Sequence, residues 1–385
     1  MSVPQVPLGE ILAPAPIRRA GDRDYPLLSM TMRDGLVEQG RKFKKRVASR
    51  ETDNYRVVRR GELVVGFPID EAVLATQRVV DEGIVSPAYA VWSIDTAIAD
   101  PVYLERFLRS PEAIAYYKAH LRGTTARRRT LPPDKFRDMR VPLPPLERQL
   151  KIASMLDKAD AIHRKRAQCL ALSDQLVRSV FVEMFGDPTL NEKGLPKKPL
   201  SAFGRIVTGN TPSRADPGNF GSAVEWIKSD NISAEHHILT PATEGLSEKG
   251  RALGRTVPAG SILVTCIAGS PASIGRAAIA DREVALNQQI NAITPNANVD
   301  LYFLYGQFLV GKSLIMRSST NSMKGMVSKG EFQRIEFLFP KLGEQRKYGS
   351  VFARQVATTS SMRADLERSE QLFRSLSQRA FHGEL

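Results

Sequence analysis

The most constraining feature of the sequence is an internal duplication. Residues 144–185 align with residues 340–381 without a gap, at an offset of 196, and 13 of these 42 positions are identical. The same register holds upstream, where Phe136 meets Phe332 and Thr124 meets Thr320. A chance match rarely keeps one register this long, and 385 residues are enough for two domains. We therefore expect two equivalent halves, each a block of about 140 residues followed by a repeated segment.

Each repeated segment is predicted to be a long helix. Pro144 and Pro145 are tolerated in the first turn of a helix, and Gly186 followed by Asp187-Pro188 is a stop signal. Between them, apolar or small residues alternate three and four positions apart, at Ile152, Met155, Ala159, Ile162, Cys169, Ser173, Leu176 and Val180. A helix of about 35 residues spans roughly 50 Å. The spacing favours a coiled coil of the two helices, and two separate core helices are the alternative.

The blocks that precede the helices are predicted to hold strands, turns and one or two short helices. Strand patterns occupy 55–58 and 62–66 in the first block, and 261–265, 276–280 and 289–293 in the second. A helical segment follows in each block, around 102–121 and 301–316. The predicted fold class is therefore α+β, with mixed or antiparallel strands. The predicted boundaries are 1–141 and 191–339 for the blocks, and 142–190 and 340–385 for the helices.

Composition excludes several classes of protein. No run of about 18 apolar residues exists, so we expect no membrane span, and the N-terminus lacks the pattern of a secretory signal. Two cysteines, Cys169 and Cys266, are too few for a disulfide framework or a four-ligand zinc site. This usage fits a reducing compartment, and we expect a cytoplasmic protein.

The stretch Gly306–Ser313 matches the spacing of a phosphate-binding Walker A loop. A phosphate loop follows a strand and exposes backbone N–H groups in a Gly-rich turn. Here Phe308, Leu309 and Val310 stand between the glycines, inside an apolar stretch that begins at Leu301. We expect an amphipathic helix at this position, and nucleotide binding is the weaker alternative.

Other signals of catalysis are absent from the sequence. It contains no Gly-x-Ser-x-Gly elbow, no methyltransferase tetrapeptide and no Gly-x-Gly cofactor loop. His236 and His237 are adjacent, so in a strand they would point to opposite faces and could not easily share one metal. We therefore expect no catalytic residue, metal or cofactor on this chain.

Charge is the first positive indication of function. Lys and Arg total 55 against 41 acidic residues, a net charge of +14, and the excess is spread over both blocks rather than held in a tail. A spread positive field suits a polyanion such as DNA or RNA. A basic protein that binds no nucleic acid is the alternative.

Basic clusters and polar side chains supply the candidate DNA contacts. Lys and Arg neutralise phosphates, whereas Arg, Asn, Gln and Ser read base edges. The first block offers Arg41, Lys42, Lys44, Lys45, Arg127, Arg128 and Arg129. The second block offers Asn210, Thr211, Ser213, Lys228, Arg276, Lys324 and Lys329. A solvated charged face is the alternative for each cluster.

A series of short motifs points to one family. The second block contains GNTPS at 209–213, WIKSDNI at 226–232, GSILV at 260–264, GRAAI at 275–279 and NQQ at 287–289. The helix entry at 142–149 and the exit at 181–188 complete the series. Their order, together with the duplication, resembles the specificity subunit (HsdS type) of Type I restriction–modification enzymes. The first block resembles another branch of the same domain, through 25–30 and 83–89.

The resemblance implies an architecture and a function. Two target-recognition domains would be joined by two long helices in an antiparallel coiled coil with a pseudo-two-fold axis. The chain would read a bipartite, asymmetric DNA target and dock two methyltransferase (M) subunits, and a restriction (R) subunit is left open. S-adenosylmethionine, ATP and Mg would belong to these partners. A coiled-coil scaffold without sequence-specific DNA binding is the competing interpretation.

Overall fold

The structure is a computed structural model that describes residues 3–384 except 33, 43–51, 123–130, 234 and 319–324. The chain forms two compact units. Unit 1 comprises Met1–Lys165 with Leu366–Leu385, and unit 2 comprises Arg166–Asp365. Each unit contains one predicted block and part of both long helices. The boundaries between the units fall inside the long helices, whereas the predicted domains separate the helices from the blocks. The predicted boundaries at 141, 190 and 339 therefore stay a prediction.

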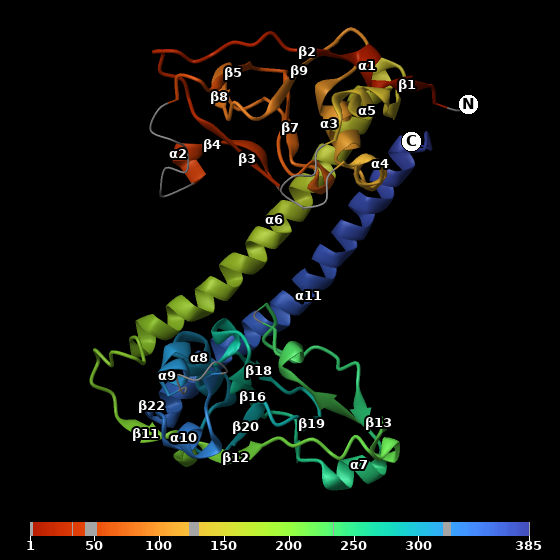
Figure 1. Ribbon diagram of the computed structural model, residues 1–385. Helices are drawn as coiled ribbons and strands as arrows, with labels where there is room; N and C mark the ends of the chain where they lie inside the picture. The colour runs from red at the N-terminus through yellow and green to blue at the C-terminus, as the bar shows by residue number, and fades with distance from the viewer. Residues whose placement is uncertain are drawn as a thin grey trace. The chain divides into compact units, whose positions relative to one another are not determined.

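Both repeated segments are long helices, as predicted. Helices α6 (Leu146–Phe185) and α11 (Leu342–Phe381) have 40 residues each, or about 60 Å at 1.5 Å per residue (Figure 1). In unit 1, Ile152 near the start of α6 shares a core with Phe381 at the end of α11. In unit 2, the ring of Phe181 near the end of α6 lies 5.3 Å from that of Tyr348 near the start of α11. Within each unit the helix segments are therefore antiparallel, as the resemblance implied.

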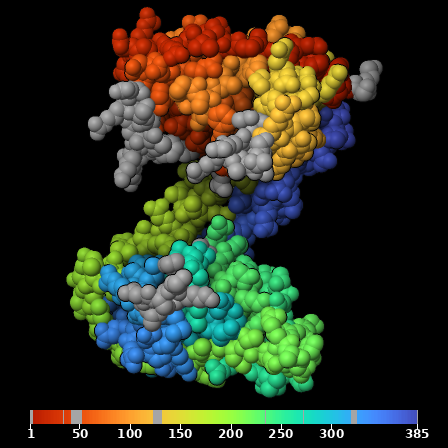
Figure 2. Space-filling view, viewed as in Figure 1, coloured from red at the N-terminus to blue at the C-terminus, as the bar shows by residue number. Residues whose placement is uncertain are grey.

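The predicted apolar seam of α6 was wrong in detail. Met155, Ile162 and Leu176 are 40%, 50% and 57% exposed, and Cys169 is also exposed. Much of α6 lies at the molecular surface (Figure 2). Side chains of α6 enter hydrophobic cores at the two ends of the helix, where they pack against aromatic side chains of the blocks. Phe181, for example, stacks on Phe303 of unit 2 with 5.9 Å between ring centroids.

Unit 1 is built on a four-stranded sheet in the order β2-β9-β6-β7. Its strands are β1 (Gln5–Pro7), β2 (Leu12–Pro14), β3 (Leu28–Thr31), β4 (Gly35–Glu38), β5 (Arg56–Arg59), β6 (Leu63–Val65), β7 (Leu74–Thr76), β8 (Glu82–Val85), β9 (Ala90–Ile94) and β10 (Arg140–Pro142). Its short helices are α1 (Leu8–Ile11), α2 (Gln39–Lys42), α3 (Pro101–Leu108), α4 (Pro111–His120) and α5 (Pro133–Asp138). Asp100 and Ser110 cap α3 and α4 with their side chains, which fixes where these helices begin.

Unit 2 contains two four-stranded sheets, in the orders β12-β20-β16-β18 and β14-β13-β19-β15. Its strands are β11 (Lys197–Pro199), β12 (Gly204–Thr208), β13 (Phe220–Ile227), β14 (Gly245–Leu246), β15 (Thr256–Val257), β16 (Ile262–Thr265), β17 (Ile267–Ala268), β18 (Ala277–Ile279), β19 (Val284–Leu286), β20 (Ile290–Pro295), β21 (Gly325–Met326) and β22 (Glu336–Leu338). Its short helices are α7 (Glu248–Leu253), α8 (Leu301–Val310), α9 (Lys312–Arg317) and α10 (Lys329–Arg334). Strands β13 and β19 are parallel, whereas their other neighbours are antiparallel.

The duplication extends to the strand topology. The order β2-β9-β6-β7 in unit 1 matches β12-β20-β16-β18 in unit 2, and the pair β1-β10 matches β11-β22. The antiparallel pair β5-β8 likewise matches β15-β19. The two blocks thus share one α+β fold, although the sequence repeat is clear only in the helices.

A buried glutamine fixes the entry of each long helix in the same way. Gln149 accepts a hydrogen bond from the backbone N–H of Asp100 at 2.8 Å and donates to the carbonyl of Pro144 at 2.8 Å. Gln345 repeats this arrangement with the backbone N–H of Asp300 at 3.0 Å and the carbonyl of Pro340 at 2.9 Å. Both glutamines are fully buried, so each amide ties the first turn of a long helix to the start of α3 or α8.

The Walker-like stretch is helical, as predicted. It runs through α8 and α9, and Gly306 and Gln307 are buried. A Cβ atom on Gly306 would lie 2.7 Å from the hydroxyl of Tyr348, so the glycine allows α8 to approach α11 closely. A phosphate cannot be cradled by this buried helical backbone, which excludes the P-loop alternative.

Candidate nucleic-acid interface

Three polar turns meet at one edge of unit 2. In the parallel pair, Ile227 of β13 lies beside Leu286 of β19, so the carboxyl ends of both strands reach the same edge. The N–H of Asn287 donates to the carbonyl of Ile227, and the N–H of Asn210 donates to that of Leu286, both at 3.0 Å. These bonds bring together segments 209–214, 228–231 and 287–289, which we call the strand-end edge.

The first part of the strand-end edge is a group of amide side chains. The backbone N–H of Gln289 donates to Asn287 Oδ1 at 3.0 Å, and Asn287 Nδ2 donates to Gln289 Oε1 at 3.0 Å. Ser229 Oγ also donates to Gln289 Oε1, at 3.3 Å. The hydroxyl of Thr211 donates to Gln288 Oε1, and both of these side chains are exposed. Hydrogen-bonding side chains are therefore held in place at a surface.

The second part is a pair of cations packed on aromatic rings. Lys228 Nζ lies 5.2 Å from the ring centroid of Trp226, and the Arg214 guanidinium lies 5.1 Å from that of Phe220. Glu244 pairs with Lys228 at 2.5 Å and with Arg214 at 3.0 Å. The hydrogen bonds from Lys228 and then from Arg214 hold the pKa of Glu244 below its usual value, so its carboxylate is charged.

The predicted contacts of the second block lie partly in the strand-end edge, at Asn210, Thr211, Ser213 and Lys228, and partly outside its three segments, at Arg276 and Lys329. Asn210 and Thr211 follow β12, and Lys228 follows β13. Arg276 is joined through its carbonyl to the N–H of Thr265, at the end of β16. Lys329 begins α10 and is exposed. Ser213 is exposed in the same segment as Thr211.

Asn210 has a local role in addition to its predicted one. Its Oδ1 accepts from the N–H of Arg255 at 2.9 Å, and its Nδ2 donates to the carbonyl of Leu253 at 2.9 Å. The side chain thus ties segment 209–214 to the end of α7. Because its amide already bonds to backbone, Asn210 is better suited to shaping the edge than to reading bases.

Part of the predicted site lies outside the described residues. Lys44, Lys45, Arg127, Arg128, Arg129 and Lys324 lie outside the described residues. Arg41 and Lys42 end the short helix α2 of unit 1. The predicted DNA contacts in the first block therefore stay a prediction.

Residue-level prediction missed the partners that organise the edge. Glu244 lies in a loop before β14, and Ser229 lies in a short turn after β13. Neither was predicted as a contact, although Ser229 formed part of the motif at 226–232, because a single acid or serine in a loop carries no local signal. Gln288 and Gln289 formed part of a family motif, but they were not predicted as contacts. A run of three polar residues, Asn287 to Gln289, directly after an apolar strand was the signal that could have identified them.

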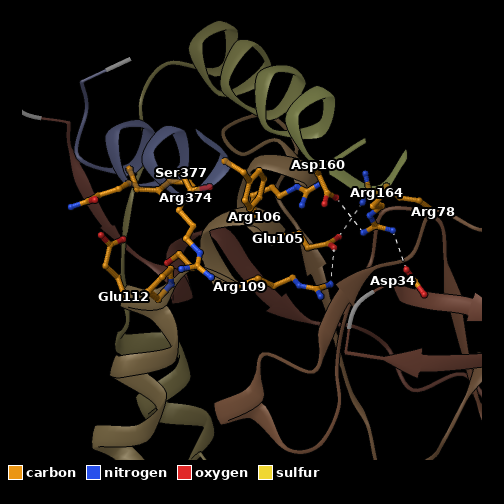
Figure 3. A pocket seen from close by; sticks show the side chains of 15 residues that line it. Asp34, Arg78, Glu105, Arg106, Arg109, Glu112, Asp160, Arg164, Arg374 and Ser377 are labelled. Carbon is orange, nitrogen blue, oxygen red and sulfur yellow. Dashed lines mark hydrogen bonds and ion pairs between the residues drawn. The ribbon is translucent and has the colours of Figure 1, made fainter. Parts of the chain in front are cut away.

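A charged cavity of about 640 Å³ lies in unit 1, among α3, α4, α6 and α11 (Figure 3). The guanidinium of Arg106, on α3, donates to Asp157 at 2.7 Å and to Asp160 at 2.9 Å, both on α6. Arg109 lies 3.6 Å from Glu105, and Arg164 lies 3.2 Å from Asp160. Since each of these cations faces a carboxylate, the cavity is better explained as an ion-pair network that ties α3 to α6 than as a ligand site.

The described residues offer neither a metal site nor a membrane-spanning helix. No group of His, Cys, Asp and Glu in the described part of the chain could hold a metal ion. Among the same residues, no helix is long and apolar enough to cross a membrane.

Comparison with known proteins shows a similarity over part of the chain. A model of the Type I restriction modification DNA specificity domain matches residues 196–368, which contain the strand-end edge. The specificity subunit of the Type I restriction enzyme HindI, from Haemophilus influenzae, is 30% identical over 182 residues, covering 43% of this chain and 37% of that protein. The chain therefore contains a match to the Type I specificity domain, and it is similar to specificity subunits of Type I restriction enzymes.

Solved structures of chains from Type I restriction–modification systems share the fold. The S subunit of a Type I system from M. genitalium aligns over 98% of this chain and 96% of its own, with a TM-score of 0.61 and 13% identity. A chain from a Type I system solved for its complex assembly and conformational transition aligns over 100% and 98%, with a TM-score of 0.53 and 18% identity. The predicted fold of two domains joined by long helices is thereby confirmed. The sequence alignment with the curated HindI subunit spans only about a third of that protein's length.

Proposed function

We propose that this chain is the DNA sequence-recognition subunit of a Type I restriction–modification complex. It reads a bipartite, asymmetric target, and each of its two blocks contacts one half-site. The observation that carries the proposal is the strand-end edge inside the matched specificity domain, where fixed amide groups lie beside cations. Amides can read base edges in the major groove, and cations neutralise the phosphates that position the protein.

Partner binding is the second part of the proposal. Large apolar side chains are exposed along α6, at Leu150, Met155, Ile162, Leu172 and Leu176. Such a stripe on a long helix is suited to burial by another protein. We assign it to two methyltransferase subunits, which bring S-adenosylmethionine and flip the target base out of the duplex. A restriction subunit with ATP and Mg is a further partner of such complexes, and the complex would act in the cytoplasm.

The proposal is tested by selection of bound sequences from a random duplex library, with the full chain alone and with its methyltransferase partner. Two short constant DNA sequences separated by a fixed gap are the expected result. One constant sequence alone would mean that only one domain reads DNA. A stable complex that enriches no sequence would refute recognition and favour a coiled-coil scaffold.

The long helices provide a second arm of this experiment. If α6 sets the distance between the half-sites, inserting one helical turn into α6 and its counterpart in α11 adds about 5.4 Å, or between one and two base pairs of duplex. The selected gap should lengthen accordingly, while the two constant DNA sequences on either side of it stay the same. An unchanged gap would show that the helices do not set the spacing.

A further inference from the structure

Gln289 occupies an unusual position among the amides of the strand-end edge, because its orientation is fixed by hydrogen bonds that start at the backbone. Its own N–H donates to Asn287 Oδ1. A backbone N–H can only donate, so this bond identifies the oxygen of the Asn287 amide. The other end of that amide is then an NH₂ group, which must donate to Gln289 Oε1. The flip of the Gln289 amide follows from this chain of bonds.

The acceptor capacity of Gln289 Oε1 is used within the protein. A carbonyl oxygen has two lone pairs, and this one accepts from Asn287 Nδ2 at 3.0 Å and from Ser229 Oγ at 3.3 Å. Nε2 makes no hydrogen bond with any residue that the structure describes, and the side chain is partly exposed. The group that Gln289 presents to a ligand is therefore an NH₂ donor.

The backbone around Gln289 is held as firmly as its side chain. Its carbonyl accepts from the N–H groups of Cys266 at 2.8 Å and Ile267 at 3.1 Å. Asn287, which orients the amide, is only 6% exposed and is anchored to β13 through the carbonyl of Ile227. A donor fixed in this way loses little conformational entropy when it binds.

We propose that Gln289 is a specificity-determining residue that reads a hydrogen-bond acceptor on the major-groove edge of one base. This inference rests on the proposed function and identifies the base chemistry that unit 2 selects. Guanine presents O6 and N7, and thymine presents O4, all of which accept from an NH₂ group. Adenine is the weaker match: its N7 accepts from an NH₂ group, but its N6 is a donor that needs the amide oxygen, which is already used within the protein. Cytosine presents only a donor.

The experiment compares the bases selected from a random library by the full-length wild type and two variants. Gln289→Glu keeps Oε1 for Asn287 and Ser229 but replaces the donor with an acceptor. Gln289→Met keeps the length of the side chain and removes its hydrogen bonds. Gln168→Glu, at an exposed position of α6 in unit 2, introduces the same charge away from the edge and is the matched control.

The wild type should select guanine or thymine at one position of a half-site. Gln289→Met should lose that preference by roughly tenfold, and Gln289→Glu should shift it toward cytosine, with every other position unchanged. Gln168→Glu should select the wild-type motif. If Gln289→Glu unfolds at a lower urea concentration than the wild type, the result with Gln289→Met decides the test, because that variant adds no charge.

Two results would overturn the inference without touching the proposed function. One is a wild-type motif that both Gln289 variants reproduce at every position. The other is a preference for adenine at the position that Gln289→Met relaxes. A wild type that selects no motif at all would instead refute the proposed function.

Discussion

Removing one cation from the strand-end edge should change how DNA affinity depends on salt. Lys228 follows β13, and its Nζ lies 5.2 Å from the Trp226 ring and 2.5 Å from Glu244. If Lys228 neutralises one phosphate, Lys228→Ala releases one counterion fewer on binding. The slope of log K against log salt should then become shallower by about 0.9.

This change in slope has a measurable consequence. Between 50 and 200 mM salt, a slope difference of about 0.9 makes the affinity deficit of Lys228→Ala shrink by roughly 3.5-fold. Fluorescence anisotropy with a labelled duplex, titrated at four salt concentrations, resolves such a difference. The ratio of cognate to non-cognate affinity should change little, because a phosphate contact carries no sequence information.

Lys198 provides the control for this measurement. Its Nζ also lies over an aromatic ring, at 4.0 Å from the centroid of Phe339, but it belongs to β11, which precedes the amino end of β12. The strand-end edge follows the other end of β12. Lys198→Ala should therefore keep the wild-type slope. If Lys228→Ala and the wild type give parallel lines, or if both lysine variants flatten the slope equally, the assignment of Lys228 to a phosphate is wrong.

Three other outcomes are expected. Glu244→Gln should raise the affinity for every duplex several-fold at low salt, because the carboxylate that competes with phosphate for Lys228 is removed; unchanged anisotropy titrations would contradict this. Gln149→Ala should lower the free energy of unfolding in urea by about 2–4 kcal/mol, because a fully buried amide and its hydrogen bonds are lost. Burial lowers the pKa of His237 to about 4, although Asp174 opposes this shift, so the unfolded state binds the proton more readily. The contribution of His237 to stability is thus complete above about pH 6.5 and lost as pH falls toward 4, and urea unfolding of His237→Gln should show a weaker dependence over that window.

The long helices could be predicted from sequence because their ends are marked locally. Pro144 and Pro145 set the entry of α6, and Gly186, whose φ of 77° is left-handed, ends it. The buried face of α6 could not be predicted, because it depends on which neighbour covers each residue. Ile162 has the spacing of a seam residue yet is half exposed, whereas Phe181 is buried by aromatic rings from far along the chain.

The candidate site likewise combines features that could be predicted from the sequence with features that could not. The positive charge of Lys228 could be seen in the sequence, but its pairing with Glu244 arises only when a loop returns to β13. Ser229 and Gln289 are sixty residues apart and meet because β13 and β19 are parallel neighbours. Predicting hydrogen-bonding residue types was therefore easier than predicting which of their atoms remain available to a ligand.

The comparison of the two units supports different specificities for the two half-sites. The glutamine that fixes each long helix is the same in both, as Gln149 and Gln345, so the framework is repeated closely. The residues that follow the corresponding strands are not. Ser86 and Pro87 come after β8, where Asn287 and Gln288 come after β19. Ala88, at the position of Gln289, donates its N–H to Ser86 Oγ at 3.3 Å. Neither Ala88 nor Ser86 has a side-chain amide, so unit 1 cannot build the same chain of amide bonds. Two copies of one framework with different strand-end turns would read different bases, which would make the proposed target asymmetric.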